Sequence, residues 1–118
     1  MKAQIRSIGA YLPERRMANE EFTKFIDTSD DWIVSHTGIK FRHLAKEEQA
    51  SSDLACLASI KAIERAGITP KDIDLILLAT VTPDYPGFPS TACILQERLG
   101  ATNAGALDIT AACTGKPG

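Results

Sequence analysis

The stretch Ala104-Gly-Ala-Leu-Asp-Ile-Thr-Ala-Ala-Cys-Thr-Gly115 combines a short apolar segment with a run of small residues around one cysteine. Leu107 and Ile109 indicate a buried strand, and the small residues after them allow a sharp turn that would expose the thiol of Cys113. A helix that begins at such a turn would lower the pKa of this thiol, because unpaired amides at a helix start favour the thiolate. The segment therefore indicates an acyl-accepting nucleophile, and a buried small cysteine is the alternative interpretation.

Upstream of this stretch, helix patterns and strand patterns alternate. Residues 51–66 carry large apolar residues at helical spacing and a second face of alanines, so we expect a largely buried helix that Ser51 or Ser52 caps and Gly67 ends. Residues 74–81 form a continuous apolar run, as in a parallel strand covered on both faces. A further helix is expected over residues 90–99. This order predicts an α/β layer fold.

The first forty residues contain weaker signals. Residues 4–12 are expected to form a strand, and Asn19 is expected to cap a short helix. Ser29 is expected to cap a second helix, which carries Trp32 and ends at Gly38. Trp32 is the only tryptophan, and its neighbours are mostly polar. Two interpretations are equally supported: the indole is a core anchor, or it stacks on a flat ligand ring.

Composition excludes several classes of function. The 118 residues have a formal net charge of −2, and lysine and arginine are scattered, so we expect neither a nucleic-acid partner nor an anionic membrane surface. No secretory signal or membrane-length apolar run occurs, and we expect a cytoplasmic protein. The three cysteines lack C-x-x-C spacing, which argues against a disulfide framework and against a metal site.

Six segments, in this order, resemble β-ketoacyl-acyl carrier protein synthase III, the condensing enzyme that starts bacterial type II fatty-acid synthesis. The resemblance runs from about Ile5 to Gly115 but covers only the first third or so of such an enzyme. We therefore expect residues 1–118 to be a partial N-terminal thiolase-like domain that is truncated just after the nucleophile, with the C-terminal half absent. The matching segments are Asp27-Thr-Ser-Asp-Asp-Trp-Ile-Val34, Thr37-Gly-Ile39, Ser52-Asp-Leu-Ala55, Ala79-Thr-Val-Thr-Pro-Asp84, Phe88-Pro-Ser-Thr-Ala-Cys93 and Asp108-Ile-Thr-Ala-Ala-Cys-Thr-Gly115.

The resemblance implies a thiolase fold, of which this chain would supply part of the N-terminal half of an αβαβα sandwich, usually in a homodimer. It implies that Cys113 takes an acetyl or other short acyl group from coenzyme A. The carbanion formed when malonyl-acyl carrier protein loses carbon dioxide would then attack this acyl-cysteine. The coenzyme A thioester is a substrate in this scheme, and neither a resident cofactor nor a metal is implied.

The resemblance also implies roles for three other residues. Trp32 matches a tryptophan that stacks on the adenine of coenzyme A, and Thr28 matches a threonine that helps to hold that ring. Phe88 matches a loop aromatic that borders the acyl pocket of the partner subunit. At position 36 the family commonly has an arginine facing the coenzyme A phosphates, whereas this chain has His36. A mostly neutral imidazole would bind phosphate less strongly.

The catalytic His and Asn of the family lie beyond the matched segments and do not map onto this chain. After Gly115 the sequence Lys116-Pro117-Gly118 also departs from the family, which continues into a long buried helix. We therefore expect that this chain alone neither condenses nor decarboxylates. The alternatives are an inactive folded fragment or interaction module, and a related thiolase-fold synthase for another starter unit.

Overall fold

The computed structural model describes residues 2–112, which belong to two compact units. One unit is Leu12–Glu48. The other joins the residues before Leu12 to those from Gln49 onward. Within residues 2–112, no helix is both long enough and apolar enough to span a bilayer.

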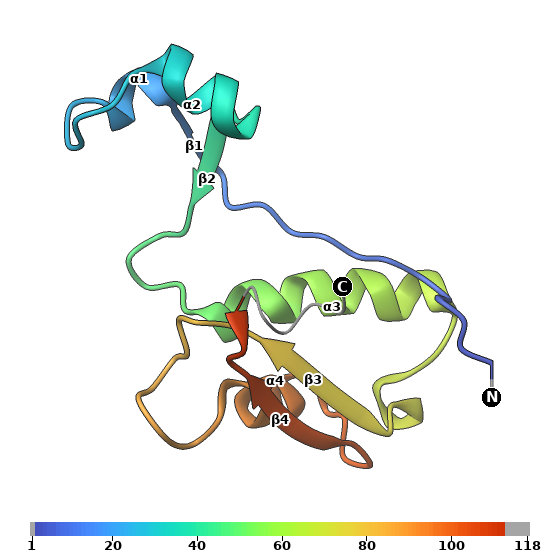
Figure 1. Ribbon diagram of the computed structural model, residues 1–118. Helices are drawn as coiled ribbons and strands as arrows, with labels where there is room; N and C mark the ends of the chain where they lie inside the picture. The colour runs from blue at the N-terminus through green and yellow to red at the C-terminus, as the bar shows by residue number, and fades with distance from the viewer. Residues whose placement is uncertain (1, 113–118) are drawn as a thin grey trace. The chain divides into compact units, whose positions relative to one another are not determined.

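The larger unit has the predicted order of helix, strand, helix and strand (Figure 1). It contains a parallel pair of strands, in which Leu75 lies opposite Gly105 and Ala79 lies opposite Ile109. The predicted α/β organisation is therefore confirmed. The elements are α3 (Ser51–Ala66), a short 3-10 turn η1 (Pro70–Asp72), β3 (Leu75–Ala79), α4 (Thr91–Leu99) and β4 (Gly105–Ile109).

The two ends of α3 are set in different ways. Gly67 follows the last turn with a left-handed φ of 66°, as predicted. At the other end the N-cap is Ala50, and the Asp53 carboxylate accepts a hydrogen bond from the Ala50 N–H at 2.8 Å. This bond, together with the Arg98 guanidinium, holds the pKa of Asp53 below its usual value. The predicted serine cap is therefore wrong.

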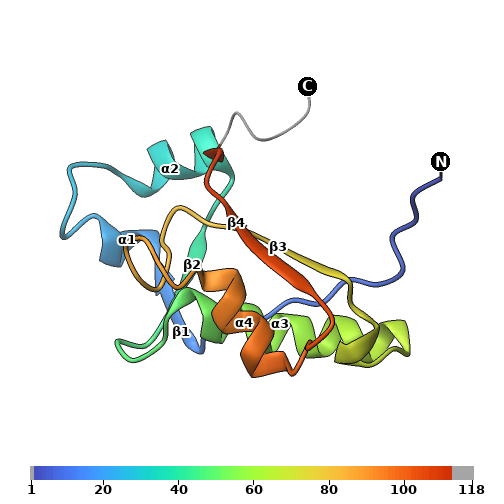
Figure 2. The same ribbon diagram turned by 90° about the horizontal axis from the view of Figure 1, so that it is seen from below.

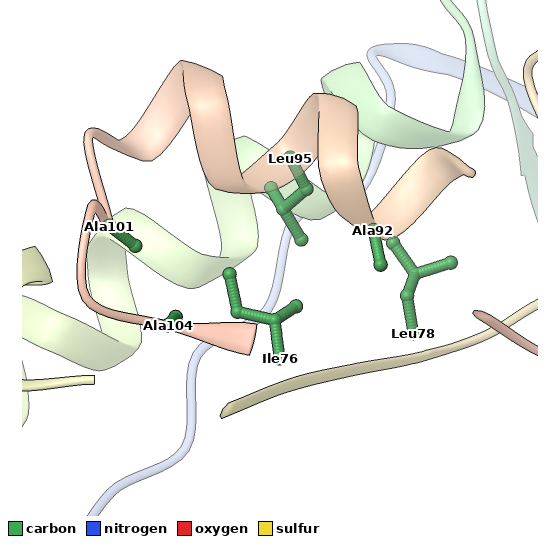
Figure 3. Close-up of a cluster of buried hydrophobic side chains, with 6 residues drawn as sticks. All are labelled: Ile76, Leu78, Ala92, Leu95, Ala101 and Ala104. Atoms are coloured by element: carbon green, nitrogen blue, oxygen red, sulfur yellow. The ribbon is translucent and has the colours of Figure 1, made fainter. Parts of the chain in front are cut away.

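The core of this unit lies between the sheet and α4 (Figures 2 and 3). Ile76 and Leu78 are two positions apart on β3, so they lie on the same face of the strand and point toward Ala92 and Leu95 of α4. Because side chains alternate along a strand, only every second residue of β3 reaches this core. Ala101 and Ala104 in the connection to β4 complete the buried cluster.

The opposite face of the sheet is apolar and exposed within the described residues. Leu75 is 52% exposed, Leu77 is 55% exposed and Leu107 is 47% exposed. The sequence pattern predicts a strand covered on both faces, whereas the described chain covers only the face toward α4. The helix α3 also differs from expectation, because Leu57 and Ile60 are exposed.

Residues 2–11 run along α3 rather than joining a sheet (Figure 1). The Ser7 hydroxyl donates to the Ala62 carbonyl at 2.7 Å. Gly9 packs so closely that a Cβ at this position would lie 2.3 Å from the Ala58 carbonyl oxygen and 2.6 Å from the Ala62 nitrogen. The alanine face of α3 thus permits the close approach that its small residues predict. The prediction of a strand over residues 4–12 is wrong, because this segment lies against α3 and does not pair with a strand of the described residues.

The smaller unit contains β1 (Arg15–Ala18), α1 (Asn19–Phe22), α2 (Asp30–Thr37) and β2 (Phe41–Leu44). β1 and β2 are antiparallel, with Arg15 opposite Leu44 and Ala18 opposite Phe41. The Ser29 hydroxyl accepts a hydrogen bond from the Trp32 N–H, and Gly38 ends α2 with a φ of 70°, so both predicted ends of this helix are confirmed.

A buried asparagine joins three segments of the smaller unit. The Asn19 side chain donates to the Asp30 carboxylate at 2.7 Å and to the Ile39 carbonyl at 2.8 Å. It also accepts a hydrogen bond from the Arg42 guanidinium at 2.6 Å. Asn19 is the first residue of α1 and not its N-cap, which is Ala18. The predicted capping role is wrong because the side chain satisfies distant partners instead.

We predict that Gly9→Ala lowers the free energy of unfolding by about 1–3 kcal/mol, because the new methyl group overlaps backbone atoms of α3. Urea unfolding followed by circular dichroism measures this change. Gly105→Ala is the matched control, since its methyl group would meet Leu75 at an ordinary 3.5 Å. Equal stability of the two variants would contradict the close approach.

Candidate functional site

The carboxyl ends of the parallel strands meet at one edge of the sheet, where ligands bind in many open α/β folds (Figure 1). The Thr80 N–H donates to the Ile109 carbonyl at 3.1 Å and so extends the strand pairing by one step. Beyond this bond lies a cavity of about 500 Å³. Its lining consists of Ala79, Thr80, Val81, Thr82, Ile109, Ala111 and Ala112.

One residue in the wall of this cavity has an unusual backbone conformation. Ala112 has a φ of +50°, in the left-handed region that non-glycine residues rarely adopt. Such a conformation costs an alanine about 1–2 kcal/mol, so the surrounding structure must hold it in place. Cys113, the predicted nucleophile, is the next residue in the chain and lies outside the described residues. The sharp turn predicted after β4 includes Cys113, Thr114 and Gly115, so most of it also lies outside the described residues.

Asp108 fixes the end of β4 to the start of α4. One carboxylate oxygen accepts the Thr91 N–H at 2.8 Å, and the other accepts the Ala92 N–H at 2.7 Å. These amides belong to the first turn of α4, where N–H groups have no partner within the helix. The negative charge also suits the positive end of the helix dipole. Asp108 therefore anchors the segment that leads to Ala112.

Asp84 anchors the other wall in a similar way. Its carboxylate accepts the Ser52 N–H at 3.0 Å and the Ser52 hydroxyl at 2.5 Å, at the first turn of α3. Its own N–H donates to the Thr91 hydroxyl at 3.0 Å. Ser52 and Thr91 are fully buried. The loop after β3 is thus held against the first turns of both helices.

Sequence reasoning missed the roles of these two carboxylates. The Thr82-Pro83-Asp84 segment has the composition of an ordinary turn, and its partner Ser52 lies 32 residues away. Asp108 did carry a signal, because a charged residue inside an apolar strand needs a partner when it is covered. The sequence does not say which helix start provides that partner.

A second cavity, of about 540 Å³, lies within the smaller unit and brings Thr28 and Trp32 together. Trp32 is 55% exposed, so the indole is not a core anchor of the described chain. Asp27, Thr28 and Ser29 contribute polar groups to the lining, and the other lining residues are apolar or aromatic. The remaining lining residues are Phe22, Ile26 and Ile33. This cavity therefore has an aromatic surface beside hydroxyl and carboxylate groups.

Phe88 belongs to the larger unit and lies on the loop between β3 and α4. Its side chain is 91% exposed, which is unusual for a phenylalanine. The structure therefore brings Thr28 and Trp32 together at one cavity and leaves the Phe88 side chain exposed. Among residues 2–112, no cluster of His, Cys, Asp or Glu side chains is arranged to hold a metal ion.

No family model matches the chain, whereas several curated proteins are similar to it over almost its whole length. The chain is 54% identical over 113 residues to "Beta-ketoacyl-[acyl-carrier-protein] synthase III" of Xanthomonas oryzae pv. oryzae. The aligned residues make up 96% of this chain and 34% of that protein. The protein of the same name from Helicobacter pylori strain P12 is 53% identical with the same coverage. The chain thus spans about a third of these relatives.

Solved structures give the same result. The 3-oxoacyl-[acyl-carrier-protein] synthase III of Aquifex aeolicus VF5 superposes with a TM-score of 0.85 at 45% identity, over 97% of this chain and 36% of that one. The priming β-ketosynthase of the R1128 polyketide biosynthetic pathway gives a TM-score of 0.81 at 32% identity, over 90% and 31%. The described chain therefore has part of a thiolase-like α/β fold.

We predict that Asp108→Asn lowers the free energy of unfolding by about 1.5–3 kcal/mol, because the amide loses the charge and can accept only one of the two helix N–H bonds. Denaturant titration measures the loss. Asp74→Asn is the control, since this carboxylate is exposed and should change stability by less than about 0.5 kcal/mol. A small effect at both positions would show that Asp108 does not anchor α4.

Proposed function

We propose that this chain, which belongs to the β-ketoacyl-[acyl-carrier-protein] synthase III family and spans about a third of its relatives, supplies the nucleophile and part of the substrate pocket of a condensing acyltransferase. Within that family we assign it to the N-terminal portion of the thiolase-like domain. The substrates would be a short acyl-coenzyme A, such as acetyl-coenzyme A, and malonyl-acyl carrier protein. The cytoplasmic location expected from the sequence belongs to this proposal.

The proposed acyl transfer begins at the Cys113 sulfur. The thiolate attacks the thioester carbonyl of acyl-coenzyme A, the bond to the coenzyme A sulfur breaks, and an acyl-cysteine remains. Malonyl-acyl carrier protein then loses carbon dioxide, and its carbanion attacks the acyl-cysteine carbonyl. The new carbon–carbon bond forms as the Cys113 thiolate leaves, which returns the nucleophile to its starting state.

The observation that carries this proposal is the backbone at Ala112. Its left-handed conformation is placed at the cavity beyond the carboxyl ends of β3 and β4, one residue before the cysteine. A strained backbone conformation of this kind is typical of sites where a nucleophile must be presented away from its neighbours. Asp108 supports it by fixing the preceding strand to α4.

The cavity in the smaller unit fits the role proposed for Thr28 and Trp32. Adenine is flat and aromatic, and the exposed indole of Trp32 provides a stacking surface of matching shape. The Thr28 hydroxyl lies on the same cavity and can exchange hydrogen bonds with ring nitrogens. We therefore propose this cavity as the coenzyme A adenine site.

Phe88 fits a role toward a second subunit. An aromatic side chain that is 91% exposed on a loop gains most of its burial energy only when a partner covers it. We propose that Phe88 borders the acyl pocket of the partner in a homodimer. A second candidate function, condensation with another starter acyl group, is favoured by the likeness to the R1128 priming β-ketosynthase.

We predict that incubation with acetyl-coenzyme A adds the mass of one acetyl group to the chain, because Cys113 accepts the acyl group as a thioester. Intact-mass spectrometry measures the adduct, and peptide mapping locates it. No adduct on the native chain would instead support an inert folded module.

The other two cysteines provide matched controls. Cys93 is exposed and Cys56 is partly buried, so both test for unspecific acetylation. We expect Cys93→Ala and Cys56→Ala to keep the adduct and Cys113→Ala to abolish it. An adduct that survives Cys113→Ala would assign the chemistry to another residue.

We predict that Trp32→Ala weakens coenzyme A binding about 5- to 10-fold, because the adenine loses its stacking surface. Isothermal titration calorimetry gives the dissociation constants. Phe25→Ala serves as the control, since Phe25 is an exposed aromatic of the same unit that does not line the cavity. Equal weakening by both substitutions would argue against a specific indole contact.

A further inference from the structure

His36 stacks on Trp32. The two residues are one helical turn apart on α2, so their side chains emerge on the same face of the helix. Their ring centroids are 4.2 Å apart, and the ring planes differ by only 19°. The imidazole therefore covers part of one indole face, while Trp32 remains 55% exposed.

Hydrogen bonds hold the imidazole in this position. Its Nδ1 atom lies 2.8 Å from the Trp32 carbonyl oxygen and 3.1 Å from the Ser35 hydroxyl. A carbonyl oxygen can only accept a hydrogen bond, so the Nδ1 atom must carry the proton that it donates to Trp32. The ring is thus folded back along α2 toward the preceding turn, rather than extended into solvent.

His36 is absent from the lining of the cavity that Trp32 helps to form. Trp32 is a lining residue of that cavity and is the residue on which the imidazole stacks. A buried aromatic is fixed by packing on all sides, whereas a half-exposed indole can change its side-chain torsions. The stacked imidazole removes part of that freedom before a ligand arrives, which lowers the entropy lost on binding.

We propose that His36 is a positioning residue, which pins the Trp32 indole so that its open face receives a flat heteroaromatic ring such as the purine of a nucleotide. This inference rests on the proposed coenzyme A site. This role needs only the planar imidazole ring, whereas direct phosphate binding would need an N–H group at the Nε2 atom, because the Nδ1 atom is engaged by the helix. The effect of the imidazole then depends on ring shape and not on charge.

Fluorescence of the full chain tests the pinning without any ligand, because Trp32 is the only tryptophan. We expect His36→Ala to raise the acrylamide quenching constant of Trp32 and to lower its fluorescence anisotropy. His36→Phe keeps a planar ring and should stay close to the native values. Lys24→Ala is the control for a distant change, and circular dichroism confirms that each variant is folded. Unchanged quenching in His36→Ala would overturn the proposal.

Binding of adenosine 3′,5′-bisphosphate and of adenosine tests the consequence for a ligand. We expect His36→Ala to weaken both about fivefold, at low and at high salt, and His36→Phe to restore binding to within about twofold. A loss confined to the bisphosphate, and abolished by salt, would instead assign His36 to direct phosphate contact and overturn the proposal. If the native chain binds neither probe, the adenine site fails, while the quenching experiment still decides whether His36 pins Trp32.

Discussion

Two carboxylates at helix starts hold the larger unit in the form that its candidate site requires. Asp108 binds the first amides of α4, and Asp84 binds the first turn of α3. Each satisfies N–H groups that a helix cannot pair internally, and each ties a strand or loop to that helix. Asp108 lies in β4 and Asp84 lies in the loop after β3, so both act near the strand ends where the cavity and the left-handed Ala112 lie. The hydrogen bonds at these two helix starts therefore help to hold the strand and the loop that surround the site proposed for Cys113.

In the smaller unit, an uncharged side chain, that of Asn19, joins separate segments of the chain. Asn19 exchanges three hydrogen bonds with Asp30, Ile39 and Arg42, which come from α2, from the connection after it and from β2. Asp30 is the first residue of α2, so this asparagine helps to fix the helix that carries Trp32. The aromatic cavity thus lies on a short helix whose orientation is set by a buried polar network.

Local signals in the sequence predicted most of the fold, and long-range pairings explain what they missed. Ser29, Gly38 and Gly67 act within one turn of their helices, so their roles could be predicted. The pairing of Arg15–Ala18 with Phe41–Leu44 could not be predicted, because no tight turn joins the two strands and they are far apart in the sequence. For the site, the family resemblance singled out Thr28 and Trp32, and both line one cavity of the smaller unit, while their role there stays a prediction. Asp84 was missed because its partner is distant.

Gly9 gives the N-terminal segment a fixed alignment on α3. Its neighbours Ile8 and Ala10 both carry a Cβ, whereas the space beside Ala58 and Ala62 admits none. A slip of one residue in either direction would press a methyl or larger group into the helix backbone. The hydrogen bond from Ser7 to Ala62 would be lost in the same movement. The lack of a side chain at Gly9 therefore sets the position of residues 2–11 along α3.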